Sequence, residues 1–150
     1  MTGLAKAGLE ETGPVVSGLK DFIENFAQDN QADVVIFDTA AGTHCPVIQA
    51  LLGVQQAYTV TEPTPMGAYD LDLILNLCQQ LKVPTKIILN QADLGNEERI
   101  EQIAKKYQQQ IVQKLPYSKK IAQAYAQGSL LELKEISEIS PKTFSISSNL

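Results

Sequence analysis

The chain alternates short apolar runs with amphipathic helical patterns, and this alternation restricts its possible folds more than any other feature. Four runs rich in β-forming residues lie at intervals of about 25 residues, at 34–37, 57–61, 86–89 and 111–115. Helical spacing of apolar residues predicts helices over 14–28, 46–52, 65–82, 96–109 and 119–127, and a weaker one over 130–139. Strands that alternate with helices build βαβ units and hence a parallel sheet. We therefore expect an α/β fold, with a mostly parallel sheet of about four strands flanked by helices.

Length and composition indicate one compact domain. The chain has 150 residues, of which 44% are hydrophobic, and this is enough to bury a proper core. We expect residues 1–13 to form a leader or loop, 14–139 the α/β core and 140–150 a frayed tail.

Charge and cysteine usage exclude several classes of partner. The net charge is −5 and the lysines are dispersed, so no basic surface for nucleic acid is expected. No apolar run approaches the roughly 20 residues that span a bilayer, and no signal peptide is recognisable, so we expect a cytoplasmic protein. Cys45 and Cys78 do not form a disulfide framework, and we expect both to be reduced.

The run at 34–37 ends in the carboxylate of Asp38, which makes this residue a site candidate. Its continuous apolar pattern is typical of a strand buried on both faces of a sheet. In open α/β sheets ligands bind beyond the carboxyl ends of the strands, where Asp38 could face a phosphate-bound Mg²⁺. Gly42 follows, and it adopts positive φ at little cost. The alternative is that Asp38 caps the helix that follows.

Polar residues also follow the other three runs. They are Thr61-Glu62, Asn90 to Asp93, and Pro116-Tyr117. Because the carboxyl ends of parallel strands meet at one edge of a sheet, we expect these residues to lie along the same edge as Asp38. This alignment favours the interpretation of Asp38 as a site residue.

Four blocks of the sequence resemble the MinD/ParA/Mrp superfamily of P-loop ATPases. The blocks are Asp38-Thr-Ala-Ala-Gly-Thr-His-Cys-Pro-Val, Val60-Thr-Glu-Pro-Thr-Pro-Met-Gly-Ala-Tyr-Asp-Leu, Ile88-Leu-Asn90 and Leu115-Pro-Tyr117. They come in the family's order over roughly residues 10–135, and they are most similar to members that carry an inserted ferredoxin domain. The resemblance implies the three-layer α/β/α fold of P-loop NTPases.

The resemblance also implies roles for individual residues, with ATP and Mg²⁺ as cofactors. Asp38 matches the Walker B and switch II acid, which reaches Mg²⁺ through water, and Gly42 matches the switch II glycine. Asn90 matches the asparagine that binds the adenine edge, and Pro116 and Tyr117 match the loop that lines the base. Residues 62–65 match a signature loop to which we assign no chemical role; a loop shaped by its two prolines is the alternative.

The chain departs from the family in important respects. The phosphate-binding run Gly-Lys-Gly-Gly-x-Gly-Lys-Thr is absent from the 37 residues before Asp38, so nothing visible cradles the β- and γ-phosphates. The sequence therefore resembles the C-terminal portion of such an ATPase. The ferredoxin insertion is also absent, and an iron–sulfur cluster on Cys45 is not expected, because a cluster shared across a dimer needs a second cysteine from each subunit.

One motif of the sequence could indicate guanine rather than adenine as the base. Asn90-Gln-Ala-Asp93 is similar to the guanine-reading Asn-Lys-x-Asp of GTPases, but it lacks the lysine, and the other blocks indicate adenine.

Two functional hypotheses remain. Under the first hypothesis the chain belongs to a nucleotide-dependent enzyme whose P-loop comes from a missing portion or a partner chain. Under the second it is a non-catalytic module that dimerises or pairs through an exposed sheet edge. The resemblance further implies homodimers and iron–sulfur or redox proteins as partners.

Overall fold

The structure, a computed structural model, describes residues 12–129, and these residues form two compact units. The first unit comprises 12–57 with Leu73–Pro84, and the second comprises Tyr58–Asp72 with 85–129. Residues 1–11 of the expected leader, the helix expected over 130–139 and the tail lie outside the described residues. The single domain expected from composition stays a prediction.

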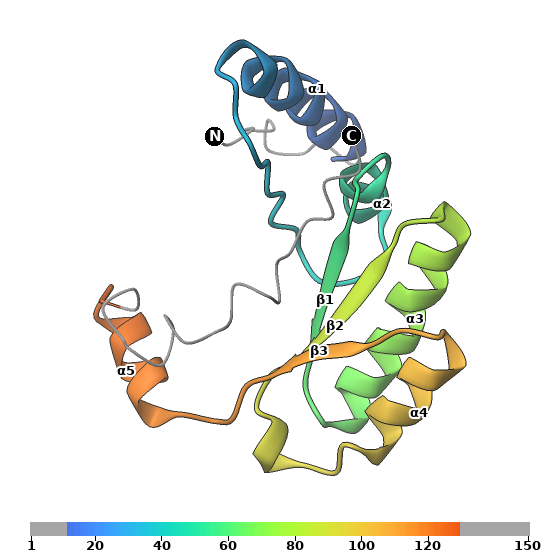
Figure 1. Ribbon diagram of the computed structural model, residues 1–150, viewed down its shortest axis with the longest axis vertical. Helices are drawn as coiled ribbons and strands as arrows, with labels where there is room; N and C mark the ends of the chain where they lie inside the picture. Colours follow the sequence, from blue (N-terminus) through green and yellow to red (C-terminus); the bar gives the residue numbers. More distant parts are fainter. Residues whose placement is uncertain (1–11, 130–150) are drawn as a thin grey trace. The chain divides into compact units, whose positions relative to one another are not determined.

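The first unit contains helices α1 (Gly13–Asp29) and α2 (Cys45–Leu51), both drawn in blue to blue-green in Figure 1. Both were expected, and both begin with a proline in the first turn, where its missing N–H costs no hydrogen bond. Lys20 on α1 is buried, and its Nζ donates hydrogen bonds to the carbonyl oxygens of Ala50, at 3.4 Å, and Leu52. The α1 lysine thus satisfies carbonyl groups that the end of α2 leaves without partners.

The core of this unit forms where the C-terminal half of α3 (Pro65–Leu81) meets its neighbours. Its buried members are Ala57, Cys78 and Val83, and Leu51, Val54, Ile74 and Leu81 pack around them. Cys78 is 1% exposed, so this small thiol is part of the core.

One expectation for the first unit is wrong. Residues 34–37 belong to no strand, and Val34, Val35 and Ile36 are 52%, 37% and 85% exposed. An apolar run becomes a buried strand only when other strands pair with it on both sides, and within residues 12–129 none pairs with this segment. On α1, Gly13 and Lys20 are buried, whereas Phe22 and Phe26 are 57% and 45% exposed.

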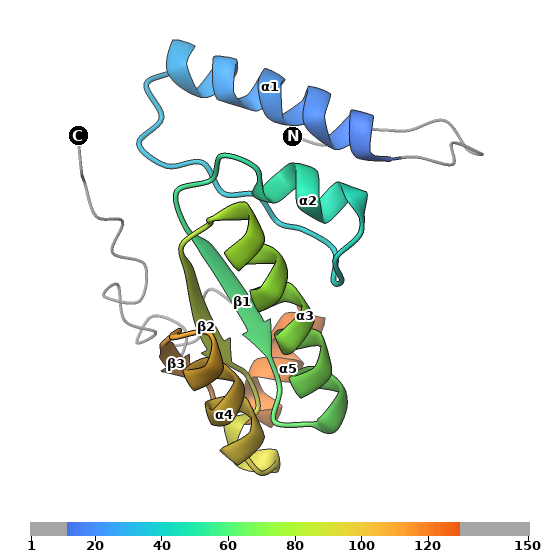
Figure 2. The same ribbon diagram turned by 90° about the vertical axis from the view of Figure 1, so that its right-hand side faces the viewer.

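The second unit is built on a three-stranded sheet in the order β1 (Ala57–Thr61), β2 (Thr85–Leu89) and β3 (Ile111–Lys114). β2 and β3 are parallel, with Ile87 opposite Ile111 and Leu89 opposite Lys114. Figure 2 shows β1 and β2 running in the same direction. The sheet therefore has three of the four expected strands, in the parallel arrangement that the alternating sequence predicted.

Helices flank this sheet, as expected. The start of α3 and α4 (Glu98–Lys106) lie side by side against it (Figure 2), and Lys106 Nζ bonds Asp72 Oδ1 at 2.7 Å. Ile87, Leu89 and Ile100 fill the interface, each 1% exposed or less. The 3₁₀ turn η1 (Ala92–Leu94) follows β2, and α5 (Lys119–Ala126) follows β3.

The helix starts agree with the sequence at α3 and differ at α4. Helix α3 begins at Pro65 as expected, and Thr64 caps it, since its Oγ1 accepts a 3.0 Å hydrogen bond from the Gly67 N–H. Helix α4 begins at Glu98 rather than at Asn96, because the Asn96 side chain accepts a 2.9 Å hydrogen bond from the Glu98 N–H and forms a turn before the helix.

Candidate functional site

The carboxyl ends of the three strands are joined by backbone hydrogen bonds into one rim. The Asn90 N–H donates to the Thr61 carbonyl at 2.8 Å, and the Leu115 N–H donates to the Leu89 carbonyl at 2.8 Å. The Ala92 N–H then donates to the Leu115 carbonyl at 2.9 Å. The polar groups that the sequence placed after these three strands therefore do lie together, at the edge where open α/β sheets bind ligands.

The loop that contains Asn90 is fastened to the loop that contains Pro116 and Tyr117. The Tyr117 N–H donates a 2.6 Å hydrogen bond to Asp93 Oδ1. Asn90 is half-buried at the end of β2, while Pro116 and Tyr117 are exposed, Tyr117 at 43%. A half-buried amide residue and an exposed aromatic residue thus lie on adjoining loops.

A side-chain bond ties the signature loop 62–65 to the same rim. The backbone of Gln91 has a φ of +51°, a left-handed conformation that residues other than glycine seldom adopt. Its Nε2 donates a 2.9 Å hydrogen bond to Glu62 Oε1. This hydrogen bond holds the Gln91 side chain against the signature loop.

Two glycines hold the signature loop from either side. A Cβ on Gly67 would lie 2.4 Å from the Glu62 carbonyl oxygen, and one on Gly95 would lie 2.1 Å from the Pro63 carbonyl oxygen. Thr61 Oγ1 also donates to the Gly67 carbonyl at 2.9 Å. The sequence offered the two prolines as the feature that shapes this loop, and close backbone contacts also shape it.

Asp38 and Gly42 lie in the first unit, in the irregular segment before α2. Asp38 is exposed and has no hydrogen bond or ion pair with any other residue in 12–129. It does not cap the following helix, since the cap position of α2 is occupied by His44, so that alternative is wrong. Gly42 has a φ of +103°, the conformation for which a glycine was expected there.

The electrostatics of the rim come from a charge cluster at the end of β3. Lys114 pairs with Glu97, and with Glu101 at 3.7 Å. The hydrogen bond that Lys114 donates to the Glu97 carboxylate raises the pKa of Lys114 above its ordinary value. Among the described residues no three His, Cys, Asp or Glu side chains gather into a metal site, and no helix within 12–129 is long and apolar enough to cross a membrane.

The structure matches that of a ParA family ATPase from Chlorobium tepidum. The TM-score is 0.59 and the identity is 24%, over 92% of this chain and 57% of that one. The chain has a ParA-like fold. The chain is also 31% identical over 128 residues to an uncharacterized protein of Methanocaldococcus jannaschii, a match that covers 85% of this chain and 42% of that protein.

No family model matches the sequence. The chain spans only 57% and 42% of the lengths of these two proteins. The finer resemblance to MinD, to Mrp and to members with a ferredoxin insertion stays a prediction, as does the absence of an iron–sulfur cluster.

Proposed function

We propose that this chain is the C-terminal part of a ParA-like, adenine-nucleotide-dependent ATPase. In this proposal Asn90, Pro116 and Tyr117 hold the base, and Asp38 with Gly42 forms the switch II loop. The observation that supports it most is the 2.6 Å hydrogen bond from the Tyr117 N–H to Asp93, because it brings the two base-lining loops together beside the strand ends.

The chemistry of this rim suits an adenine base. An asparagine amide offers one donor and one acceptor, which complements the N6 and N7 edge of adenine. The exposed ring of Tyr117 provides a surface on which a base can stack. Asp93 already accepts a hydrogen bond from the Tyr117 N–H through one carboxylate oxygen. This favours a structural role for Asp93 over a role in reading guanine, and therefore favours adenine as the base.

Asp38 would act on the metal that accompanies the phosphates. Carboxylates are the ligands that Mg²⁺ prefers, and Mg²⁺ keeps several of its waters. Asp38 is exposed and free of partners within 12–129, so it can accept a hydrogen bond from such a water. The phosphate-binding N–H groups and lysines must come from a P-loop that is not among residues 1–150.

Complementation tests this proposal. We expect the chain alone to hydrolyse ATP no faster than background, and to gain activity when a segment carrying Gly-Lys-Gly-Gly-x-Gly-Lys-Thr is fused to it or supplied separately. In the complemented protein, Asp38→Ala should lower activity by about 10- to 100-fold, as for other residues that act on a metal through its shell.

A matched control is available on the same segment. Asp33 is also an exposed aspartate, and Asp33→Ala should leave hydrolysis unchanged. For the base, Asn90→Ala should weaken binding of a fluorescent ATP analogue, whereas Asn25→Ala on the exposed surface of α1 should not. Activity in the complemented protein that survives Asp38→Ala, or equal affinity for ATP and GTP analogues, would overturn the proposal.

A second candidate function is pairing with another chain through an exposed edge. It is favoured by the exposed apolar side chains of Val34, Val35 and Ile36, which join no sheet within 12–129. Unpaired apolar segments of this kind invite strand addition. Sedimentation at rising concentration should then show dimers with slowed amide exchange at 34–37, whereas a monomer with these amides already protected would rule this function out.

A further inference from the structure

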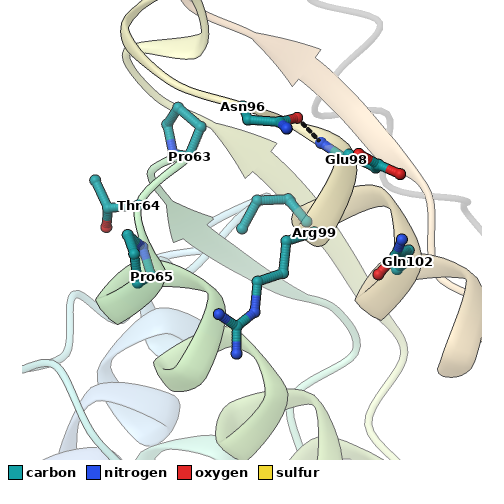
Figure 3. Close-up of a pocket in the computed structure, with 8 residues that line it drawn as sticks. Pro63, Thr64, Pro65, Asn96, Glu98, Arg99 and Gln102 are labelled. Atoms are coloured by element: carbon teal, nitrogen blue, oxygen red, sulfur yellow. Dashed lines mark hydrogen bonds between the residues drawn. The ribbon is translucent and has the colours of Figure 1, made fainter.

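A groove of about 460 Å³ lies in the second unit, between the signature loop and α4 (Figure 3). One wall is Pro63, Thr64 and Pro65, and the other consists of the turn and first half of α4. The lining residues from that second wall are Asn96, Glu98, Arg99, Ile100 and Gln102. Pro63 and Ile100 are buried and the other lining residues are exposed, so the groove has an apolar floor and is open to solvent.

The groove has a fixed shape. Thr64 caps α3, and its backbone N–H donates to the Glu62 carbonyl at 2.8 Å. Gly95 touches the Pro63 backbone so closely that no side chain fits between them. A ligand would therefore meet a preorganised wall, which lowers the entropic cost of binding.

The polar groups that remain available in the groove are mainly donors. Arg99 has no hydrogen bond or ion pair with residues 12–129, and Figure 3 shows its guanidinium on the side of Pro65, away from the Glu98 carboxylate. Thr64 Oγ1 accepts the Gly67 N–H, which leaves its O–H free to donate. Asn96 Oδ1 likewise accepts the Glu98 N–H, which leaves its NH₂ group free.

This set of groups fits a carboxylate better than a phosphate. One guanidinium binds one carboxylate through two parallel hydrogen bonds. A phosphate carries more negative charge, whereas the groove is lined by one cation and also by the carboxylate of Glu98, in a chain of net charge −5. Prolines and an isoleucine beside the arginine suit an apolar group attached near the carboxylate.

We propose that this groove binds an acidic segment of another protein. A Glu or Asp side chain would lie on Arg99, and a neighbouring apolar side chain would pack on Pro63, Pro65 and Ile100. An open groove with exposed walls suits an extended peptide rather than an enclosed small molecule. The groove would give a role to the signature loop, and it is independent of the nucleotide proposal.

Peptide titration of the full 150-residue chain tests this site. The probe is the acetylated, amidated peptide Gly-Ser-Leu-Glu-Leu-Ser-Gly, and the matched peptide has Gln in place of Glu. We expect saturable NMR shifts at the Thr64 and Asn96 amides and at the Arg99 side-chain N–H, with affinity about tenfold lower for the Gln peptide.

Variants separate a specific contact from general attraction. Arg99→Ala should weaken binding of the Glu peptide about tenfold, and Arg99→Lys should weaken it less. Lys105→Ala removes an equal charge from the same helix outside the groove and should change nothing. The proposal is overturned if the groove signals do not shift, if Lys105→Ala weakens binding as much as Arg99→Ala, or if inorganic phosphate saturates the same signals and displaces the peptide.

Discussion

The Tyr117 N–H and the Asp93 carboxylate, 2.6 Å apart, join the loop after β3 to the loop after β2. A hydrogen bond to a charged acceptor is stronger than one between neutral groups. These two residues are far apart in sequence, yet together they position Asn90 and the Tyr117 ring at the carboxyl edge of the sheet.

Asp93→Ala should loosen the loop at Pro116 and Tyr117. We expect a loss of about 1.5 kcal/mol in the free energy of unfolding, the lower end for a hydrogen bond with a charged partner because this bond is exposed, and faster hydrogen exchange at the Tyr117 amide. Asp93→Asn keeps an acceptor and should cost less. Asp70 is exposed on α3, and Asp70→Ala is the control; equal Tyr117 exchange in both alanine variants would contradict the interpretation.

Lys20→Met should destabilise the first unit. The methionine keeps the apolar stem but leaves the carbonyls of Ala50 and Leu52 without their donor, which costs about 1–3 kcal/mol when such groups are buried. Hydrogen exchange of α2 amides measures the effect. Glu24→Gln, on the exposed surface of the same helix, should not change this exchange, and a stable Lys20→Met variant would show that the buried ammonium contributes nothing.

Gly95→Ala should destabilise the second unit, although the backbone of Gly95 has an ordinary extended conformation. The added Cβ would lie 2.1 Å from the Pro63 carbonyl oxygen, and overpacking of this kind costs about 1–3 kcal/mol. Gly18 on α1 has nothing within 4 Å of the same position, so Gly18→Ala should instead stabilise its helix by roughly 0.5–1 kcal/mol. Thermal unfolding of both variants checks the opposite signs.

The ion pair of Asp72 and Lys106 should make stability depend on acid pH. The hydrogen bond from Lys106 lowers the pKa of Asp72, so the folded state binds this proton less tightly than the unfolded chain does. The contribution is therefore complete above about pH 4, the ordinary carboxyl value, and is lost as the pH falls through the lowered pKa. The stability difference between the wild type and Asp72→Asn should shrink on acidification, and it should be small throughout because the pair is solvent-exposed.

Local patterns were enough to predict most elements of the fold. β1 lies at the predicted residues, and α1, α2, α3 and α5 begin and end within a residue or two of expectation. These signals are local: Pro14, Pro46 and Pro65 favour helix starts, and β-branched runs favour strands. The order of these elements alone indicated a parallel sheet, because right-handed βαβ units allow few other arrangements.

Tertiary contacts decided what local patterns could not. Residues 34–37 have the composition of a buried strand but are exposed, because a strand needs pairing partners that no sequence pattern of its own supplies. Lys20 is buried and Phe22 exposed because the free carbonyls of α2, and not hydropathy, determine which face of α1 packs. The sequence determined that Asn90 and Tyr117 follow strands; only the folded sheet brought their loops together, through the carboxylate of Asp93.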